Sequence, residues 1–391
     1  MSSKATGVTV GIACGGTGGH LFPGLAVASE VAAKGARVVL FVSPKEVDQQ
    51  GVAGVRDRYD VEVLPSVAFS ARRLPSFAMG VVGGYRRVVK AFASTRPSVV
   101  LAMGGFTALP PVLAAKRLGA RVVLHESNAI PGRANRWLAP LSDLACAGMT
   151  ETALRWRARR VCVTGTPVRA EVRSAECLAA RRTLGIAEDR PVLLVTGGSQ
   201  GASGVNRLFL ASLPDLARLH PELQFIHLTG DHGFAEVSET YRRLGIPARI
   251  WPFSPRMDQL LAASTVVVSR SGASSLSELA ARRLPSVLIP YPTAADDHQR
   301  ANAAVFVEAG AARSLDQVSA GGADLTAQLC ELLESESRRS EMASALARLD
   351  RPQAASEIAR LMWELIPDAT RVGQVDRLSS SRANPIGAHT S

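Results

Sequence analysis

The chain has 391 residues, of which 47% are hydrophobic and 20% charged, so its length and composition suit two globular domains with substantial cores. The formal net charge of +11 suggests an anionic partner, although 40 of the 45 basic residues are arginine, a skew that genome composition also produces. Aromatic residues make up 5%, and no tract interleaves them with basic residues, which argues against nucleic acid as a partner.

The five cysteines are odd in number, widely scattered and without a C-x-x-C pair. This pattern is typical of reduced thiols in a cytoplasmic protein and argues against a disulfide framework or a zinc site. The N-terminus lacks the basic start and apolar core of a signal peptide, and no run of 18 apolar residues occurs. We therefore expect no membrane-spanning segment.

The first half of the chain alternates short apolar runs with helical patterns. A glycine-rich loop follows the first strand, and Gly35 stands where the first helix should end. Strands are expected at 8–13, 37–42, 61–64, 98–103 and 121–125, with helices to about Lys34 and Leu118. Such alternation predicts a parallel, doubly wound α/β sheet.

The same pattern restarts after a charged stretch from Arg169 to Arg190, which we interpret as an irregular linker. Strands are expected at 191–196, 223–228, 248–253, 265–269 and 286–291, and helices at 324–347 and about 353–365. We predict an N-terminal domain over 1–168 and a C-terminal domain over 169–351. A last helix over 352–366 is expected to pack back on the first domain, with a disordered tail over 367–391.

The stretch Ser269–Asn302 combines several signals of a ligand site. Ser275 and Glu278 have the spacing of a capping box, which predicts a helix starting at Ser275 whose N-terminus can bind an anion. A polar loop follows the next strand, with Asp296, Asp297, His298, Gln299 and Asn302. The alternative is an ordinary capped helix in an α/β layer.

Two glycine loops follow strands that open the two halves. The loop Gly15–Gly19 lacks the third glycine of a dinucleotide fingerprint, since position 21 is leucine, and no Gly-Lys pair of an ATP-binding loop occurs. We interpret it as a loop for close backbone approach to a phosphate-bearing ligand. Ser199, in the second loop (197–201), and Arg169, beyond a Gly/Pro turn, are further candidate anion contacts.

His20 directly follows the first glycine loop. A helix N-terminus at this point should lower the pKa of the imidazole and keep it neutral, which suits a general base. A purely structural histidine is the alternative.

The segment from Arg72 to Arg96 has the pattern of a basic amphipathic helix. Apolar residues recur every three or four positions, at Leu74, Phe77, Val81, Tyr85, Val88 and Phe92, flanked by Arg72, Arg73, Arg86, Arg87, Lys90 and Arg96. Such a helix can lie on an anionic membrane or pack its apolar stripe against the sheet.

Six motifs occur together and in order: GGTGGH (15–20), HESN (125–128), GTPVR (165–169), GGSQG (197–201), RSGA (270–273) and DHQ (297–299). With them the chain resembles the MurG family, the peptidoglycan N-acetylglucosaminyltransferases of bacteria, from about Val8 to Leu365. The resemblance implies a glycosyltransferase-B fold, in which two Rossmann-like doubly wound domains face a cleft. It also implies inverting transfer of GlcNAc from UDP-GlcNAc to the 4-hydroxyl of MurNAc in undecaprenyl-pyrophosphoryl-MurNAc-pentapeptide (lipid I), giving lipid II for cell wall biogenesis, cell shape and division.

The resemblance also implies roles for individual residues. His20 is the expected base with Glu126 behind it, and Glu278 is expected on the ribose hydroxyls, in competition with its capping role. Expected UDP-GlcNAc contacts are Thr17, Gly18, Gly19, Asn128, Arg169, Ser199, Ala273, Ser274, Ser275, Leu276, Ser277, Glu278 and Gln299. Phe106 departs from the family, which often has tyrosine there, and the loop at 292–298 departs slightly.

Further expectations concern metal, location and partners. No D-x-D carboxylate cluster lies near the glycine loops, so we expect no metal ligands and no obligatory cofactor, a divalent ion being at most stimulatory. Asp296 and Asp297 are interpreted as loop polarity. The expected location is peripheral, on the cytoplasmic face of the cell membrane, with Leu74, Phe77, Val81, Tyr85, Arg86, Arg87 and Lys90 facing anionic phospholipid. Expected partners are UDP-GlcNAc, lipid I and the cell-wall and division machinery, with no nucleic acid.

Three other functions fit the same sequence features. A UDP-GlcNAc 2-epimerase, or another enzyme with this fold, would keep the donor site and need no lipid contact. A non-catalytic protein that binds sugar nucleotides or scaffolds a membrane assembly would keep the fold without turnover.

Overall fold

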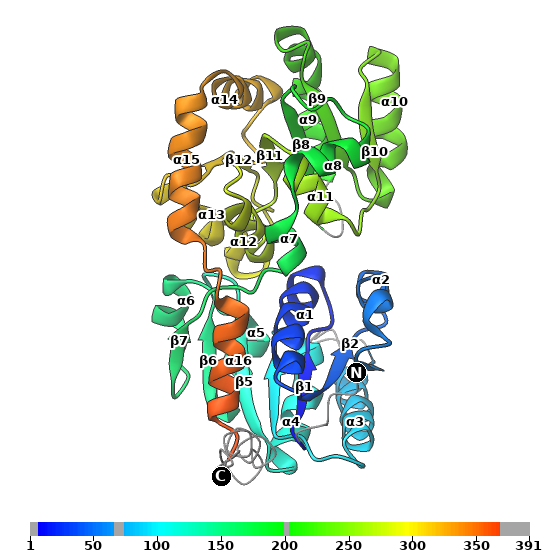
Figure 1. Ribbon diagram of the computed structural model, residues 1–391, viewed down its shortest axis with the longest axis vertical. Coiled ribbons are helices and arrows are strands. Elements are labelled where there is room, and N and C mark those ends of the chain that lie inside the picture. The colour runs from blue at the N-terminus through cyan, green and yellow to red at the C-terminus, as the bar shows by residue number, and fades with distance from the viewer. Residues whose placement is uncertain (1–6, 66–73, 199–202, 368–391) are drawn as a thin grey trace, which may run out of the picture.

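The computed structural model describes residues 7–65, 74–198 and 203–367, in two α/β halves stacked along the long axis (Figure 1). The N-terminal half holds a seven-stranded sheet of order β3-β2-β1-β4-β5-β6-β7, and the C-terminal half a six-stranded sheet of order β10-β9-β8-β11-β12-β13. All recorded strand pairs are parallel. Two Rossmann-like doubly wound units are therefore confirmed.

The N-terminal half contains the following elements. Its strands are β1 (Thr9–Ala13), β2 (Arg37–Val42), β3 (Asp60–Val63), β4 (Val99–Ala102), β5 (Arg121–Glu126), β6 (Leu144–Ala147) and β7 (Val161–Val163). Its helices are α1 (Gly18–Ala33), α2 (Glu46–Val52), α3 (Leu74–Ala91), α4 (Leu109–Arg117), α5 (Arg133–Leu138) and α6 (Thr150–Arg155), with the 3-10 turn η3 (Phe106–Ala108) before α4.

The C-terminal half and the final helix contain the remainder. The strands are β8 (Val192–Thr196), β9 (Gln224–Leu228), β10 (Ala248–Trp251), β11 (Val266–Ser269), β12 (Ser286–Leu288) and β13 (Arg313–Ser314). The helices are α7 (Ala170–Ser174), α8 (Cys177–Leu184), α9 (Ser203–Leu219), α10 (Phe234–Leu244), α11 (Met257–Ala263), α12 (Ala273–Arg282), α13 (His298–Glu308), α14 (Gly322–Glu334), α15 (Glu336–Leu349) and α16 (Ala354–Glu364), with η6 (Ala295–Asp297) before α13.

The strand order reverses beside β1 in one sheet and beside β8 in the other. Ligands of doubly wound sheets bind beyond the carboxyl ends of the strands at such a reversal. The first glycine loop follows β1, and Gly197 and Gly198, the described part of the second loop, follow β8, so the topology places these residues at the two reversals.

Strand β1 shows how the N-terminal core is built. Val10 and Ile12 face one side of the sheet, in a cluster that includes Ile358 and Met362 of α16. On the other side, a Cβ at Gly11 would lie 2.9 Å from Phe92, so a larger residue would displace that ring. The last helix therefore packs back on the N-terminal half, as Figure 1 shows for α16 below α15.

The prediction of an irregular linker over 169–190 is wrong, because α7 and α8 occupy most of it. Gly185 ends α8 in the left-handed region, with φ 63°. The buried Arg181 donates hydrogen bonds to the backbone oxygens of Ala263 (3.0 Å) and Arg190 (3.0 Å), which joins α8 to the C-terminal half. A charged arginine in this stretch suggests a solvent-exposed side chain, whereas hydrogen bonds to backbone oxygens allow Arg181 to be buried.

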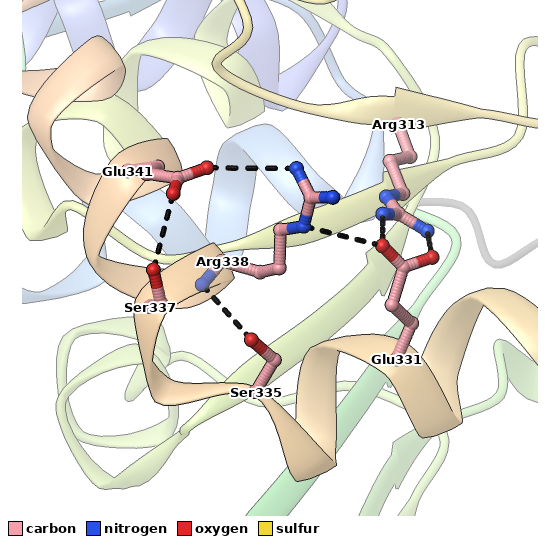
Figure 2. A network of polar contacts seen from close by, with 6 residues as sticks. All are labelled: Arg313, Glu331, Ser335, Ser337, Arg338 and Glu341. Carbon is pink, nitrogen blue, oxygen red and sulfur yellow. Dashed lines mark hydrogen bonds and ion pairs between the residues drawn. The ribbon is translucent and has the colours of Figure 1, made fainter.

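The single helix predicted over 324–347 is also wrong, because Ser335 separates α14 from α15. Its backbone is extended, and its hydroxyl accepts a hydrogen bond from the Arg338 backbone N–H (3.2 Å), so it caps the new helix. Around this corner Glu331 accepts from Arg313 (2.6 Å) and lies 3.5 Å from Arg338 (Figure 2). The Glu331–Arg338 contact links α14 to α15, and the Glu331–Arg313 contact links α14 to β13.

The tail over 368–391 lies outside the described residues. None of the described helices is long and apolar enough to cross a membrane.

Candidate active site

The first glycine loop is tied to its surroundings through its backbone. The Gly16 N–H donates to the buried carboxylate of Asp48 (2.7 Å), and the Gly16 carbonyl accepts from Lys45 Nζ (2.8 Å). Thr107 Oγ1 donates to the Gly15 carbonyl (2.6 Å), and a Cβ at Gly15 would lie 2.4 Å from the backbone of Ser43. The loop is therefore held rigidly, and one of its amides already has a carboxylate partner.

His20 lies in the first turn of α1 and is enclosed by two loops. Its Nδ1 lies 3.3 Å from Thr17 Oγ1. A Cβ at Gly104 would lie 3.1 Å from Nε2, and one at Gly105 would lie 3.3 Å from Cε1, so the ring packs on these glycines. Both have positive φ, 109° and 72°. Gly104 and Gly105, which follow β4, therefore position the imidazole ring of His20.

The pKa of His20 is lowered, in the predicted direction, but its largest cause is burial and not the helix N-terminus that the sequence suggested. The carboxylates of Glu126 and Asp48 oppose this decrease, while Lys45 and His298 add to it. The imidazole is therefore neutral near pH 7 and can accept a proton. His298 belongs to the other half, so the ring lies within electrostatic range of the opposite side of the cleft.

The Glu126 carboxylate, at the end of β5, is buried and accepts four hydrogen bonds. Oε1 accepts from the backbone N–H (3.0 Å) and the side-chain amide (2.8 Å) of Asn128. Oε2 accepts from the Gly132 N–H (2.8 Å) and from Asn135 (2.9 Å). Glu126 thus organises the loop that follows β5.

Asn302, on α13, joins that loop to the C-terminal half. It is fully buried and its Oδ1 accepts from the Ala129 N–H (2.8 Å). Its Nδ2 donates to Asn128 Oδ1 (3.0 Å) and to the Ser271 carbonyl (3.0 Å). A second link is exposed, where Asp296 pairs with Arg136 and lies 3.6 Å from Arg133. Asp296, interpreted from the sequence as loop polarity, thus also pairs with arginines of the N-terminal half.

On the C-terminal side, α12 begins earlier than predicted. It starts at Ala273 with Gly272 as N-cap and no side-chain cap, so the capping box predicted at Ser275 is wrong. Ser277 instead donates to the Ala273 carbonyl (2.9 Å), and Leu276 is buried in the core. The first N–H groups of α12 are therefore not used by a capping side chain and can face an anion.

Because no capping box forms at Ser275, the predicted competition between capping and ribose binding does not arise for Glu278. Its carboxylate lies 4.0 Å from Arg169 Nη2, and the Arg169 guanidinium lies 4.3 Å from the centre of the Phe22 ring on α1. Burial raises the pKa of Glu278 to about 7, with Asp258 adding to the increase and Arg169 opposing it. This group changes charge near neutral pH.

Gln299 is oriented by its neighbours. Its Oε1 accepts from the Tyr291 N–H (2.9 Å), and its backbone carbonyl accepts from Ser271 Oγ (2.7 Å). The side-chain NH₂ is thereby directed away from Tyr291. Ser199, Arg72, Arg73 and the side chain of Leu74 lie outside the described residues.

Helix α3 packs half of its apolar stripe inward. Val88 and Phe92 are buried against the sheet, and Phe77, Val81 and Tyr85 are half-buried. Arg86, Arg87 and Lys90 are exposed, as are Met79 (69%) and Val82 (48%), which the predicted stripe leaves out.

Next to α3, the Phe106 ring contacts Phe77 (centroids 5.7 Å apart) and the half-exposed Trp137 (5.5 Å). At the position where the family often has tyrosine, this ring therefore serves packing.

Sequence reasoning missed several residues of the site. Asp48 and Thr107 hold the first glycine loop, and Phe22 stacks on Arg169. The polar loop containing Asn302 was recognised, but its partner Asn128 lies 174 positions earlier in the chain, beyond any local pattern.

Family models for the N-terminal and C-terminal domains of glycosyltransferase family 28 match residues 10–145 and 192–358. A relative from Pseudomonas fluorescens (strain Pf-5) is 36% identical over 377 residues, covering 92% of this chain and 99% of the relative. One from Synechococcus sp. (strain JA-3-3Ab) is 36% identical over 367 residues, covering 92% and 96%. Both are named UDP-N-acetylglucosamine–N-acetylmuramyl-(pentapeptide) pyrophosphoryl-undecaprenol N-acetylglucosamine transferase.

This chain belongs to the MurG family. Acinetobacter baumannii MurG has the same fold, with TM-score 0.69, 23% identity and coverage of 91% of this chain and 99% of that one. A putative UDP-N-acetylglucosamine 2-epimerase from Listeria monocytogenes is also similar in fold, with TM-score 0.67, 16% identity and coverage of 92% and 95%. The fold alone thus fits both enzymes, whereas the sequence relatives make this MurG-family chain an N-acetylglucosaminyltransferase of peptidoglycan synthesis.

Proposed function

We propose that the chain transfers GlcNAc from UDP-GlcNAc to the 4-hydroxyl of MurNAc in undecaprenyl-pyrophosphoryl-MurNAc-pentapeptide, with inversion and with His20 as the base. The observation that carries this proposal is the neutral imidazole of His20, fixed by Thr17 and the Gly104-Gly105 backbone within electrostatic range of the C-terminal half. His20 takes the proton of the acceptor hydroxyl as its oxygen attacks the anomeric carbon, and UDP leaves with the electron pair of the broken bond.

The donor side is proposed to stabilise the leaving diphosphate by backbone dipoles and one cation. The uncapped N-terminus of α12 offers N–H groups, and Arg169, held over Phe22, offers a guanidinium. Glu278 accepts from the ribose hydroxyls, and the Gln299 NH₂ faces the sugar. The remaining proposed contacts are Thr17, Gly18, Gly19, Asn128, Ser199, Ala273, Ser274, Ser275 and Ser277, with Leu276 contributing through its backbone.

Glu126 is better suited to positioning than to the proposed role of second base. Its four accepted hydrogen bonds occupy both oxygens and would have to be given up before it could take a proton. We infer that Glu126 holds Asn128 toward the cleft.

The reaction is proposed to need no metal. Asp296, one of the two adjacent carboxylates near the cleft, is engaged by Arg136 and Arg133. Charge stabilisation by α12 and Arg169 replaces a cation in this scheme. Labelled GlcNAc should therefore pass from UDP-GlcNAc to a lipid I analogue at the same rate with and without a chelator.

The same assay separates the candidate functions. A transferase gives a labelled lipid product only when the lipid I analogue is present. Turnover of UDP-GlcNAc without acceptor would favour an epimerase, and absence of any turnover would favour a binding protein; either result overturns the proposal.

Peripheral attachment to the cytoplasmic face of the cell membrane is proposed for the N-terminal half. Exposed Met79 and Val82 supply apolar surface on α3, and Arg86, Arg87 and Lys90 supply charge. Replacing these three basic residues with glutamate should abolish binding to anionic vesicles. The matched control replaces three exposed arginines of the other half with glutamate, Arg218 of α9 and Arg242 and Arg243 of α10, and should leave binding intact. Equal loss in both variants would mean a net-charge effect and contradict attachment through α3.

A further inference from the structure

Helices α9 and α14 lie side by side in the C-terminal half, and their ends come together. A Cβ at Gly322, the first residue of α14, would lie 2.7 Å from the backbone of Ala211 on α9. From that contact, eight residues lead to Cys330 along α14 and nine lead to His220 just past the end of α9. A helix rises about 1.5 Å per residue, so these similar residue counts correspond to similar distances along the two helices. The two helices run in the same direction, which brings Cys330 and His220 to the same level.

At that level three possible metal ligands converge. One ligand atom each from His220, Cys330 and Glu334 lies within 4.8 Å of the others. Cys330 and Glu334 are four residues apart on α14 and therefore share one face of the helix. Among the described residues, no other group of three or more His, Cys, Asp or Glu side chains has this spacing.

His220 provides a second, independent observation. It is 8% exposed, and its Nε2 is buried without a hydrogen-bond partner, 3.6 Å from Glu334. Its Nδ1 lies 3.6 Å from Glu222 on the other side of the ring. Each ring nitrogen therefore faces a carboxylate, and when a cation occupies the Nε2 side, Glu222 can accept the Nδ1–H, which is the usual support of a histidine that ligates a metal.

We propose that His220, Cys330 and Glu334 form a binding site for a thiophilic divalent cation such as Zn²⁺, which joins the end of α9 to the end of α14. Thiolate, imidazole and carboxylate together suit zinc, with water as the fourth ligand. As the sulfur–metal bond forms, the Cys330 thiol releases its proton to solvent. In Figure 1, α14 lies at the end of the C-terminal half remote from α1 and α16, so the site is separate from the first glycine loop and His20.

Cobalt spectroscopy on the untagged, chelator-treated chain tests this proposal. Co²⁺ should give an intense thiolate-to-metal charge-transfer band that saturates at one ion per chain and disappears when Zn²⁺ is added. The band should be lost in Cys330→Ser and kept in Cys177→Ser, which removes an exposed thiol on α8. His220→Gln should weaken binding by more than about tenfold, and Glu222→Gln by about tenfold.

Thermal unfolding gives a second readout. Without metal, Cys330→Ser should unfold at nearly the wild-type temperature, and Zn²⁺ should raise the Tm of the wild type and Cys177→Ser only. GlcNAc transfer should be unchanged in Cys330→Ser. An equal cobalt band in Cys330→Ser, no thiolate band in the wild type, or an equal Tm increase in all variants would overturn the site.

Discussion

The two halves share a topology but present different chemistry to the cleft. In the N-terminal half, carboxylates hold the site: Asp48 binds the Gly16 amide and Glu126 binds the loop after β5. In the C-terminal half, α12 begins at Ala273, after Gly272 as N-cap, without a side-chain cap. The N-terminal half thus holds the proposed base in place, and the C-terminal half leaves backbone N–H groups available for a ligand.

The first glycine loop is less suited to binding a phosphate than its sequence suggests. Its sequence suggests a phosphate cradle, but the Gly16 N–H is bound to a carboxylate, and an anion there would face Asp48. The N-terminus of α12 and Arg169 have no such competitor at hydrogen-bond distance, since Glu278 lies 4.0 Å away. We therefore expect substitutions that displace His20 to act on kcat and those at α12 and Arg169 to act on donor affinity.

The largest expected effect is that of His20→Ala, which removes the proposed base. We expect kcat to fall by about 10²–10⁴-fold with little change in UDP affinity. Because the pKa of His20 is lowered, the acid limb of the wild-type pH–rate profile should lie below the ordinary value of about 6.5. Kinetics with a lipid I analogue check both. An unaltered kcat would remove His20 from the mechanism.

The second prediction is that the stability of the protein depends on pH through Glu278. Its folded pKa of about 7 lies above the ordinary 4.5, so its contribution to stability is fully present below pH 4.5 and is lost as the pH rises through 7. The loss amounts to roughly 3 kcal/mol over that window. Urea denaturation should therefore find Glu278→Gln more stable than wild type at pH 8, with the difference shrinking toward pH 5. Parallel stability curves would refute the shifted pKa.

Sequence reasoning succeeded where the signal is local. Short apolar runs predicted the starts of β1 and β11 to within one residue, and the glycine loops marked the ends of β1 and β8. The same local rule failed at Ser275, because Gly272 lets α12 begin earlier and needs no capping hydroxyl.

Long-range pairing explains most of the remaining misses. The Arg181 charge suggested a linker, yet its acceptors lie on Ala263 and Arg190, which no spacing rule connects. Likewise, folding brings Cys330 beside His220, 110 residues away in sequence, which no spacing rule connects. Motif spacing finds such contacts only when the residues lie close together in the chain.

The third prediction concerns the buried link between the halves. Asn302→Ala removes hydrogen bonds to Ala129, Asn128 and Ser271 and leaves buried partners unsatisfied. We expect a loss of about 2 kcal/mol in stability and a higher KM for UDP-GlcNAc. Asn302→Asp is the matched variant, since it keeps the acceptor and loses the donors. A normal KM in both would show that the link does not shape the donor site.

The fourth prediction tests whether glycines position the base. Gly105→Ala places a methyl group 3.3 Å from the His20 ring at a positive φ, so kcat should fall about tenfold. Gly230→Ala, in the C-terminal half, imposes the same backbone strain, with φ 73° and ψ 159° against 72° and 164° at Gly105, and should cost about 1–3 kcal/mol of stability without affecting kcat. If the two variants lose activity equally, strain rather than displacement of the imidazole is responsible.

The smallest effect should come from the exposed link, where Asp296 pairs with Arg136 and Arg133. All three side chains are partly solvated, between 31% and 58% exposed, so water and salt screen their attraction. We expect Asp296→Asn to cost less than about 1 kcal/mol at low salt and nothing measurable at 1 M salt. Denaturation and KM measured across a salt series check this, with Asn302→Ala as the salt-independent reference. An effect of Asp296→Asn that persists at high salt would show that the loop before α13 depends on this carboxylate for more than charge, and both links would then fix the donor side to the half that carries the base.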